Sequence, residues 1–376
     1  MSTIYAETVC ALNTRKINPD GTIKGGPVYY IREAFKGKFE KMLAAFFAVS
    51  TTMAVGFTGS MVQSNSIGFG LYNAFGIPNW LTGVILTIVC WFIFSGGLLR
   101  LSSVTEKLVP IMSYLFIGAA VAVLVARIQY LPEAFYMIFY YAFHPQAIIG
   151  GTFGEALKIA ATQGAKRRLF SNEAGMGSTP HAHVQANVSN PHDQGIVAMI
   201  GVFFDTFVIL TLNALVIIST LYTSDGILAN GYSGEVTEIV NQANLSQLAF
   251  ATVLDAGSYD GFAAQMVAVC LLFFSFSTIL SWHSFGRINI TYLFGEKVSG
   301  IYIKIALVFI FIGTLVSSNF VWEMTDMFNN LMVLPNVIAL FALTNLVVDS
   351  CNGLKKIDSG ENQNDNLEAK TDDNDN

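Results

Sequence analysis

Eight long apolar stretches constrain the fold of this 376-residue chain more than any other feature of its sequence. Each is long enough to cross the roughly 30 Å of hydrocarbon in a lipid bilayer as one helix. The stretches cover residues 42–72, 80–98, 108–128, 132–163, 195–222, 261–283, 301–318 and 328–349. Inside a membrane, only helices and closed barrels satisfy their own backbone hydrogen bonds. The sequence therefore predicts an all-α polytopic membrane protein, with a transmembrane domain of about eight spanning helices over residues 42–349.

The overall composition excludes a soluble globular protein of this length. Hydrophobic residues make up 53% of the chain and charged residues only 12%, which leaves too little polar side-chain surface to face water. The four cysteines are far apart and mostly within apolar stretches, so we expect reduced, packed side chains and no disulfide framework. The last segment, residues 350–376, is acidic and poor in apolar residues, which predicts a disordered tail.

Lysine and arginine are distributed unevenly between the loops. Residues 13–41 contain seven of them, and the loops around residues 100–107, 166–168 and 287–297 contain more. The intervening loops 73–79, 223–260 and 319–327 contain none. Because basic loops stay on the cytoplasmic side, this alternation predicts a multi-pass protein of the plasma (inner) membrane with its carboxy terminus in the cytoplasm.

One apolar stretch is interrupted in a way that suggests a transport function. Residues 132–163 contain Gly150, Gly151 and Gly154, and a polar loop follows at residues 168–183 with the sequence RLFSNEAGMGSTPHAH. Broken membrane helices usually line a substrate path, because only a water-filled or protein-lined cavity tolerates the freed backbone groups. The break and the loop therefore indicate where a substrate binds.

Several motifs, in the same order along the chain, resemble those of the sodium:alanine symporter family. They are YAETVCALNTRK, GGPVYYI, GFTGSMVQSNSI, TEKLVP, the SNEAG loop, GVFFDTFVILTLNALVI, FSTILSW and LPNVIAL. The resemblance implies a leucine-transporter-like fold of ten core helices in two inverted repeats. On that scheme the eight stretches are core helices three to ten, and residues 1–41 are the end of core helix two and a cytoplasmic loop. The chain is then expected to be amino-terminally truncated, without the first core helix and most of the second.

The resemblance implies sodium-coupled symport of alanine or glycine across the plasma membrane by alternating access. Its partners are then the small amino acid, the sodium ion and the lipid bilayer, with no nucleic acid and no cofactor apart from sodium as the coupling ion. The chain contains no phosphate-binding loop, nucleotide fingerprint or nucleophile motif, so an enzyme is not expected. The alternative is a transport-inactive truncated remnant of such a symporter with at most a structural role.

The family's substrate and ion contacts fall on four side chains in two of the stretches. Gln63 matches the substrate-contacting glutamine, Ser277 and Thr278 match a hydroxyl pair that faces sodium, and Trp282 matches the tryptophan that bounds the alanine side chain. Thr278 is also expected to contact the substrate. The alternatives are interhelical hydrogen bonding for Gln63, bonds of the hydroxyls to the preceding helical turn, and an interfacial anchor for Trp282.

The break in core helix six supplies the rest of the expected substrate site, namely Gly150, Gly151 and Phe153. The family usually has GGFAG where this chain has GGTFG, which puts the aromatic residue one position later, at Phe153. Tight helix packing without a ligand is the alternative explanation for the glycines.

Other polar residues are candidates for binding or structure. Asp205 is a carboxylate inside a predicted span, where a charge costs roughly 2.5 to 3.5 kcal/mol, so it requires a partner. It is either an ion-coupling or gating group, or a hydrogen-bond anchor through Asn213 or a neighbouring helix. His181, His183 and His192 are expected to be solvated loop residues, with no metal site beyond sodium.

Overall fold

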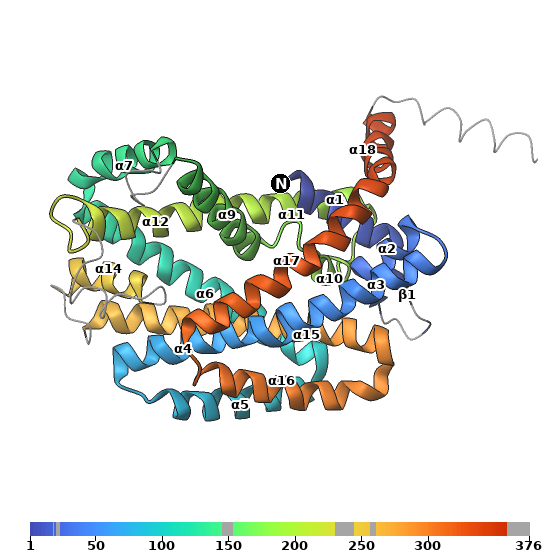
Figure 1. Ribbon diagram of the computed structural model, residues 1–376, viewed down its shortest axis with the longest axis horizontal. Coiled ribbons are helices and arrows are strands. Elements are labelled where there is room, and N and C mark those ends of the chain that lie inside the picture. Colours follow the sequence, from blue (N-terminus) through green and yellow to red (C-terminus); the bar gives the residue numbers. More distant parts are fainter. Residues whose placement is uncertain (18, 20–22, 145–152, 230–243, 256–260, 359–376) are drawn as a thin grey trace, which may run out of the picture. The chain divides into compact units, whose positions relative to one another are not determined.

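The computed structural model describes residues 1–17, 19, 23–144, 153–229, 244–255 and 261–358, and helices make up most of them (Figure 1). The chain forms two compact units. Unit 1 comprises Met1–Phe47, Ala174–Val202 and Val333–Asn376, and unit 2 comprises Ala48–Glu173 and Phe203–Met332. The boundary between Glu173 and Ala174 lies inside the SNEAG motif.

Unit 1 is built around its first helix. This helix, α1 (Ser2–Thr14), packs against α2 (Pro27–Ala34), α10 (Pro180–His183) and α18 (Thr344–Asp358). A small antiparallel hairpin of β1 (Lys16–Ile17) and β2 (Ile23–Lys24) precedes α2. The unit also contains the start of α3 (Lys38–Thr51), most of α11 (Pro191–Phe203) and the end of α17 (Ser318–Ala342).

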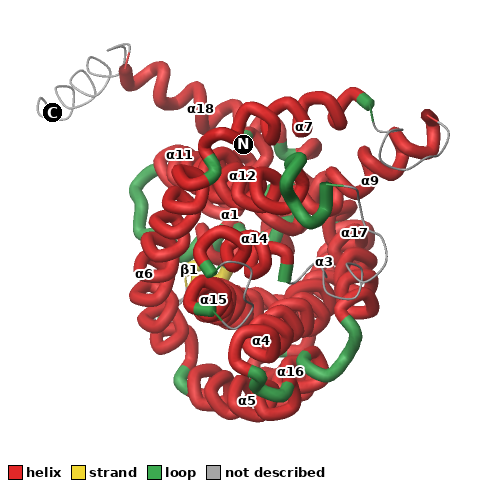
Figure 2. Tube along the Cα trace, turned by 90° about the vertical axis from the view of Figure 1, so that its left-hand side faces the viewer, coloured by secondary structure: helices red, strands yellow, loops and turns green. Residues whose placement is uncertain are grey.

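Unit 2 contains a helix pair that positions the candidate site. Helix α4 (Ser60–Phe75) continues from the π-helical segment η1 (Thr52–Gly59) and ends at Gly76, whose φ of 65° is readily adopted only by glycine. Along α4 and η1 lies α15 (Phe262–Phe294), the longest helix described. Helix α16 (Ser299–Gly313) packs against both α4 and α5 (Asn79–Ser95), and Figure 2 shows these four helices grouped together.

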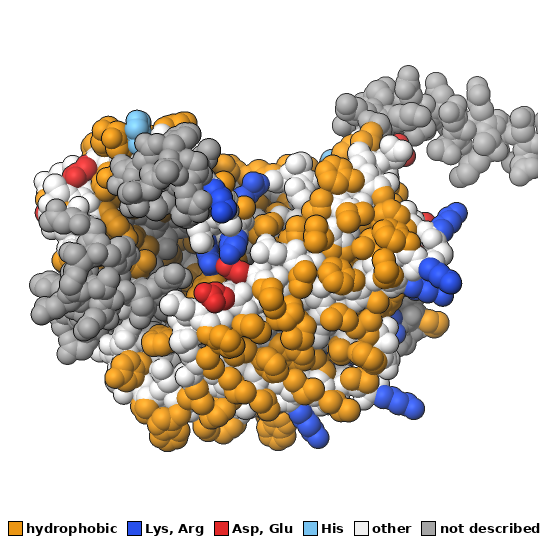
Figure 3. All heavy atoms as spheres, viewed as in Figure 1, with side chains coloured by type: hydrophobic (Ala, Val, Ile, Leu, Met, Phe, Trp, Pro, Cys, Tyr) orange, Lys and Arg blue, Asp and Glu red, His pale blue; other side chains and the backbone are white. Residues whose placement is uncertain are grey.

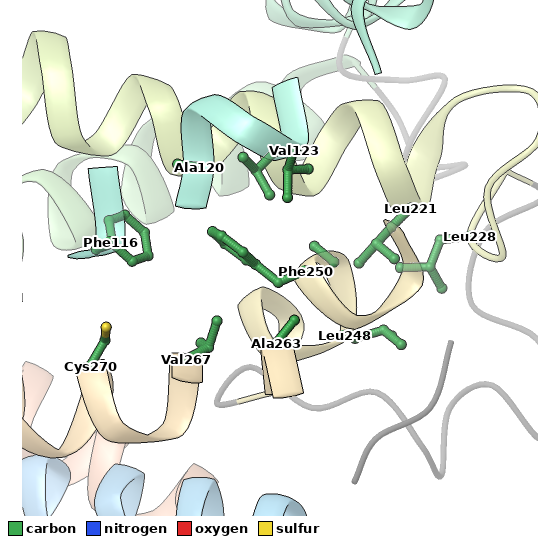
Figure 4. Packing of buried hydrophobic residues seen from close by; sticks show 12 residues of the cluster. Phe116, Ala120, Val123, Leu221, Leu228, Leu248, Phe250, Ala263, Val267 and Cys270 are labelled. Atoms are coloured by element: carbon green, nitrogen blue, oxygen red, sulfur yellow. The ribbon is translucent and has the colours of Figure 1, made fainter. Parts of the chain in front are cut away.

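The remaining elements of unit 2 surround α15 or lie beyond it. They are α6 (Gly97–Ala126), η2 (Ile128–Tyr130), α7 (Leu131–Phe143), α9 (Phe153–Asn172), η3 (Phe204–Leu210), α12 (Thr211–Ile217), η4 (Ile218–Tyr222), α14 (Leu245–Leu254) and η5 (Glu296–Val298). Figure 4 shows the hydrophobic cluster that joins α6, η4, α14 and α15. Phe250 of α14 lies at its centre, and Phe116 and Cys270 lie at one end.

The prediction of an all-α membrane protein is confirmed at this level. Among the described residues, four helices are long and apolar enough to cross a bilayer: Lys38–Phe75, Val109–Ala126, Pro191–Tyr222 and Phe262–Phe294. A fifth candidate is the pair Ser318–Ala342 and Thr344–Cys351, bent by 58°. The surface agrees, since large hydrophobic side chains of α5 such as Trp80, Ile88 and Phe92 are exposed, and hydrophobic atoms cover the α5 and α16 region of Figure 3.

The other predicted stretches are helical but shorter. Helices α5 and α16 begin just before the predicted stretches 80–98 and 301–318 and end inside them. Helices α7 and α9 overlap the two ends of the stretch 132–163, whose residues 145–152 lie outside the described part. Helix α18 extends to Asp358, past the expected domain end at residue 349, and the rest of the tail is also outside the described part. The inverted-repeat arrangement remains a prediction.

Two predicted loops contain helix instead. Residues 245–254 of the loop 223–260 form α14, an apolar segment too short to cross a bilayer but well suited to pack on α15. The prediction of a loop at residues 319–327 is also wrong, because α17 begins at Ser318. The polar residues Asn319, Glu323 and Asp326 lower the local hydropathy and so conceal the start of that helix in the sequence.

Candidate functional site

Two glycines, Gly59 at the end of η1 and Gly70 on α4, allow this continuous helical segment to approach α15 closely in an antiparallel arrangement. A side chain at Gly59 would collide with the ring of Trp282, and a Cβ atom at Gly70 would lie 3.0 Å from Leu271. The same number of residues separates Gly59 from Gly70 as separates Leu271 from Trp282. The two helices therefore pass each other in opposite directions with a constant register over this length.

This register brings two predicted site residues to the same level. Gln63 lies one turn beyond Gly59 on α4, and Thr278 lies one turn before Trp282 on α15. Both positions fall on the helix faces that the glycine contacts define. The register thus gathers Gln63, Thr278 and Trp282 along one helix–helix contact, although they are more than 200 residues apart in sequence.

Trp282 is buried inside the helix packing, with only 2% of its surface exposed. Its Nε1 donates a hydrogen bond to Oε1 of Glu173 at 2.8 Å, and the ring of Phe170 meets it edge-on with centroids 5.5 Å apart. An interfacial anchor would expose its ring edge at the membrane surface. The observed burial is inconsistent with that alternative and is compatible with a wall of a binding site.

The hydroxyl pair makes the local bonds expected of helical serine and threonine. Ser277 Oγ and Thr278 Oγ1 both donate to the carbonyl oxygen of Phe274, at 2.9 and 3.0 Å. Back-bonding to the preceding turn is therefore present. It uses the hydroxyl protons and leaves oxygen lone pairs, which are the atoms that a hard cation such as sodium binds.

The predicted helix break cannot be positioned. Gly150 and Gly151 lie outside the described residues, and Phe153 is the first residue of α9 with a side chain that is not described. Asn65, which also interrupts the apolar face of α4, has a structural role: its Nδ2 donates to the carbonyl oxygens of Gly313 and Val316, both at 2.8 Å.

Unit 2 also contains a cavity of about 350 Å³ beside the hydrophobic cluster. Its polar lining residues are Ser66, Asp205, Asn213 and Ser246. The other lining residues are apolar or aromatic: Phe116, Ile209, Leu210, Val267, Cys270, Leu271, Phe274 and Trp322. Ser66 follows Gln63 on α4 by three residues, and Phe274 precedes Thr278 by four, so the cavity begins one turn away from the level of Gln63 and Thr278.

The partner of Asp205 lies on a neighbouring helix. Ser171 Oγ of α9 donates to Asp205 Oδ2 at 3.2 Å. Asn213, the other partner considered from the sequence, instead accepts a hydrogen bond from Ser246 at 3.0 Å.

Charged side chains of α9 and α17, predicted to lie in loops, pair with one another inside helices. Arg167 Nη2 and Lys166 Nζ lie 3.0 and 3.7 Å from Asp326 Oδ2, and the Arg167 guanidinium stacks on Trp322 at 4.3 Å. The basic segment 166–168 and residues 319–327 were predicted on opposite membrane sides. All three paired residues lie inside helices rather than in loops, so they meet at one depth, and the side on which each segment leaves the membrane stays a prediction.

A buried carboxylate in unit 1 was missed in the sequence. Glu7 has no exposed surface, and it accepts hydrogen bonds from the backbone nitrogens of Gly175 and Gly177 at 3.1 and 2.9 Å and from Nδ2 of Asn336 at 2.5 Å. The hydroxyl of Tyr30 donates to Oδ1 of Asn336. A carboxylate within the apolar run IYAETVCAL was the available signal.

The geometry explains the glycines of the GMG sequence. Gly175 and Gly177 have φ values of 103° and 79°, which side-chain-bearing residues rarely adopt. These conformations turn two backbone N–H groups toward Glu7, as in an anion-binding nest. Glu7 thereby fixes the loop that follows the SNEAG motif.

The histidine prediction is wrong for His181. Only 1% of its surface is exposed, its Nδ1 lies 2.8 Å from the carbonyl oxygen of Ser178, and its ring stacks on Phe47. His183 and His192 also have protein partners, Gln194 at 3.0 Å and the Tyr5 hydroxyl at 2.7 Å. Burial lowers the pKa of His183. Within the described ranges, no group of three or more His, Cys, Asp or Glu side chains could hold a metal ion, and all four cysteines are free.

Comparison with known proteins gives a consistent match over most of the chain. The sequence profile of the sodium:alanine symporter family matches residues 1–368. The sodium/alanine symporter AgcS of Methanococcus maripaludis is 33% identical over 97% of this chain and 76% of its own length. The probable sodium/glutamine symporter GlnT of Bacillus subtilis is 34% identical over 88% of this chain and 65% of its own length. The sodium/proton-dependent alanine carrier protein of Bacillus sp. (strain PS3) is 33% identical, over 79% and 65%.

The family match over residues 1–368 does not bear out the expected amino-terminal truncation and does not favour a transport-inactive remnant. The helices, the surface and the profile match agree. This chain is a multi-pass membrane transporter, rather than an enzyme, and belongs to the sodium:alanine symporter family.

Proposed function

We propose that this chain carries alanine or glycine into the cell together with sodium, by alternating access. Membership of the family supports amino acid symport, and two of the similar proteins are named as alanine carriers, one sodium-dependent and one sodium/proton-dependent. Sodium is the coupling ion in this proposal, and no organic cofactor is needed. Alternating access follows from a leucine-transporter-like pair of inverted repeats, in which one bundle rocks against the other around a fixed site.

The proposed orientation puts the carboxy terminus in the cytoplasm. Asn13 Nδ2 donates to Ser350 Oγ at 3.3 Å, and Tyr5 Oη lies 3.0 Å from Cys351 Sγ. The middle of α18, at Ser350, therefore lies beside Asn13, the first residue of the basic segment 13–41, which supports the same side of the membrane for both. Seven basic residues in that segment favour the cytoplasmic side.

The substrate site in this proposal lies along the contact of α4 and α15. Gln63 hydrogen-bonds the zwitterion, Thr278 contacts it and, with Ser277, offers oxygen atoms to sodium, and Trp282 bounds the amino acid side chain. The observation that carries this assignment is the register that puts Gln63 and Thr278 at one level beside the Gly59–Trp282 contact. Gly150, Gly151 and Phe153 complete the site from the break in core helix six.

The bulk and fixed position of the Trp282 indole favour small substrates. Trp282 fills the space that a side chain at Gly59 would occupy, and its Nε1 is held by Glu173, so the ring has a fixed position. A pocket wall of this kind discriminates against larger side chains by steric exclusion.

A competition experiment tests the substrate. Radiolabelled alanine is bound to the purified, full-length chain in detergent, with choline replacing sodium in the control. We expect saturable binding only in sodium, with displacement by glycine and not by glutamine or leucine. Stronger displacement by glutamine than by alanine would contradict the proposed substrate and would indicate a glutamine carrier similar to GlnT.

A further inference from the structure

The cavity lined by Asp205 has an unbalanced charge. Among the described residues that line it, Asp205 is the only charged one, and none is Lys, Arg or His. The positive charges of Arg167 and Lys166, near the lining residue Trp322, are already paired with Asp326. Within the part of the chain that the structure describes, the carboxylate accepts one hydrogen bond, from Ser171, which leaves most of its acceptor sites available to other groups, because a carboxylate can accept about four.

The chemistry of the lining favours a cation over a zwitterion. A free amino acid carries a carboxylate that needs its own donors or positive charge, and the lining residues that the structure describes offer a negative charge beside neutral groups. The side-chain oxygens of Ser66, Asn213 and Ser246 are ligands of the kind that hard cations prefer. An ionisable residue inside a membrane span that faces a cavity also marks an ion path by default.

The backbone around Asp205 is unusual. Asp205 belongs to η3, a π-helical segment, and segments of this kind occur frequently at functional sites because they redirect a side chain out of the regular helix. A second π-helical segment, η1, ends at Gly59 and so lies at the Trp282 contact.

The end of α9 connects Asp205 with Trp282. Three nearly consecutive residues of the SNEAG region make the contacts: Ser171 donates to Asp205, while Phe170 and Glu173 contact Trp282. A change of charge at Asp205 thus acts on the helix end that holds Trp282.

We propose that Asp205 binds a sodium ion in this cavity during the transport cycle, with its carboxylate balancing the charge of the ion. This inference rests on the proposed function. The ion reaches a site separate from Ser277 and Thr278, and the end of α9 conveys its presence to the substrate wall at Trp282.

Direct binding of radioactive sodium to the purified full-length chain tests the proposal. We expect Asp205→Asn to weaken sodium binding by about tenfold or more, the loss of one charged ligand, while alanine affinity at saturating sodium changes little. Asp205→Glu keeps the charge and should retain most of the affinity. The matched control is Asp193→Asn, which removes an exposed carboxylate on α11 outside the cavity and should change nothing.

A milder variant covers the case in which Asp205→Asn does not fold. Ser246→Ala removes a lining hydroxyl and should weaken sodium binding by roughly threefold or more. Normal sodium affinity in both variants, or a loss confined to alanine affinity, would overturn the inference and leave the proposed function intact. Absence of saturable sodium binding by the parent chain would instead overturn the proposed function and this inference together.

Discussion

The indole Nε1 of Trp282 donates to Oε1 of Glu173 at 2.8 Å, and Glu173 holds this position with a left-handed backbone conformation, φ 56°. It is the one described non-glycine residue with positive φ. Glycine is the usual residue where a helix ends in this conformation, and α9 ends at Asn172. The strain of a glutamate there is retained in exchange for a carboxylate that fixes the tryptophan ring.

Replacing Glu173 with glycine separates the backbone strain at this position from the role of its carboxylate in holding Trp282. We expect Glu173→Gly to leave thermal stability within about 1 kcal/mol of the parent, because relief of strain offsets the lost hydrogen bond. Alanine uptake should nevertheless fall, since the Trp282 ring is no longer held. Glu173→Gln, which keeps an acceptor oxygen, is the control and should retain uptake. Equal uptake in all three proteins would show that Glu173 does not position the wall.

Truncating the wall should change selectivity. We expect Trp282→Ala to let larger neutral amino acids compete with alanine, because the indole no longer occupies the space beside Gly59. Trp282→Phe keeps a ring and should retain more of the parent's selectivity. Competition profiles measured with glycine, leucine and glutamine test this change in selectivity. Coinciding profiles for mutant and parent would show that Trp282 only packs in the helix interface and does not select the substrate.

Gln63 and Asn65 should behave differently although both are amides on α4. We expect Gln63→Ala to reduce alanine uptake with normal membrane expression and melting temperature, because substrate groups lose a partner at about 1 to 3 kcal/mol, or roughly five- to 150-fold in affinity. Asn65→Ala should lower the melting temperature, because it leaves two carbonyl oxygens without their donor. Unchanged uptake kinetics for Gln63→Ala would remove Gln63 from the site.

The carboxylate of Glu7 should be needed for stability. In Glu7→Gln, an amide group replaces one acceptor oxygen and confronts the N–H groups of Gly175 and Gly177, so we expect a loss of about 1 to 3 kcal/mol or more. Glu33→Gln, at an exposed position of the same unit, is the matched control. Equal melting temperatures for Glu7→Gln and the parent would contradict the anchoring role.

The ion pair of Arg127 and Asp225 gives a defined pH dependence. Both guanidinium nitrogens bind the carboxylate, at 2.6 and 2.7 Å, and these hydrogen bonds lower the pKa of Asp225 from 3.8 to about 2. A lowered pKa means that the stabilisation is present above pH 3.8 and is lost as the pH falls through about 2. Because the pair is exposed, its contribution should stay below about 1 kcal/mol.

Thermal melts of Asp225→Asn and the parent check this sign. The difference in melting temperature should be constant from pH 7 to about 5 and should shrink below about pH 4. In an Arg127→Gln background the Asp225→Asn change should have little effect. A difference that grows as the pH falls would be the wrong sign for this pair.

The long helices were predictable because hydropathy depends on residue content alone. The stretch 195–222 matches the helix Pro191–Tyr222 closely, and the motif order identified the family. Start points were harder wherever polar residues lie inside a helix, as at Asp326 of α17, because the partners Arg167 and Lys166 that make a buried carboxylate acceptable are distant in sequence.

The candidate site was predictable in part. Family motifs gave Gln63, Thr278 and Trp282 as candidates, which stay predictions, and the structure adds the glycine-determined register along one helix contact. The acceptor role of Glu173 and the burial of Glu7 depend on pairings between helices, which a pattern along one chain does not contain.

Uptake of alanine into proteoliposomes containing only the purified full-length chain tests the central claim most directly. With sodium high outside and low inside, we expect alanine to accumulate above its external concentration, and collapse of the sodium gradient with an ionophore should release it. Accumulation that is the same with choline in place of sodium, or its absence under every imposed sodium gradient, would contradict sodium-coupled alanine symport by this protein.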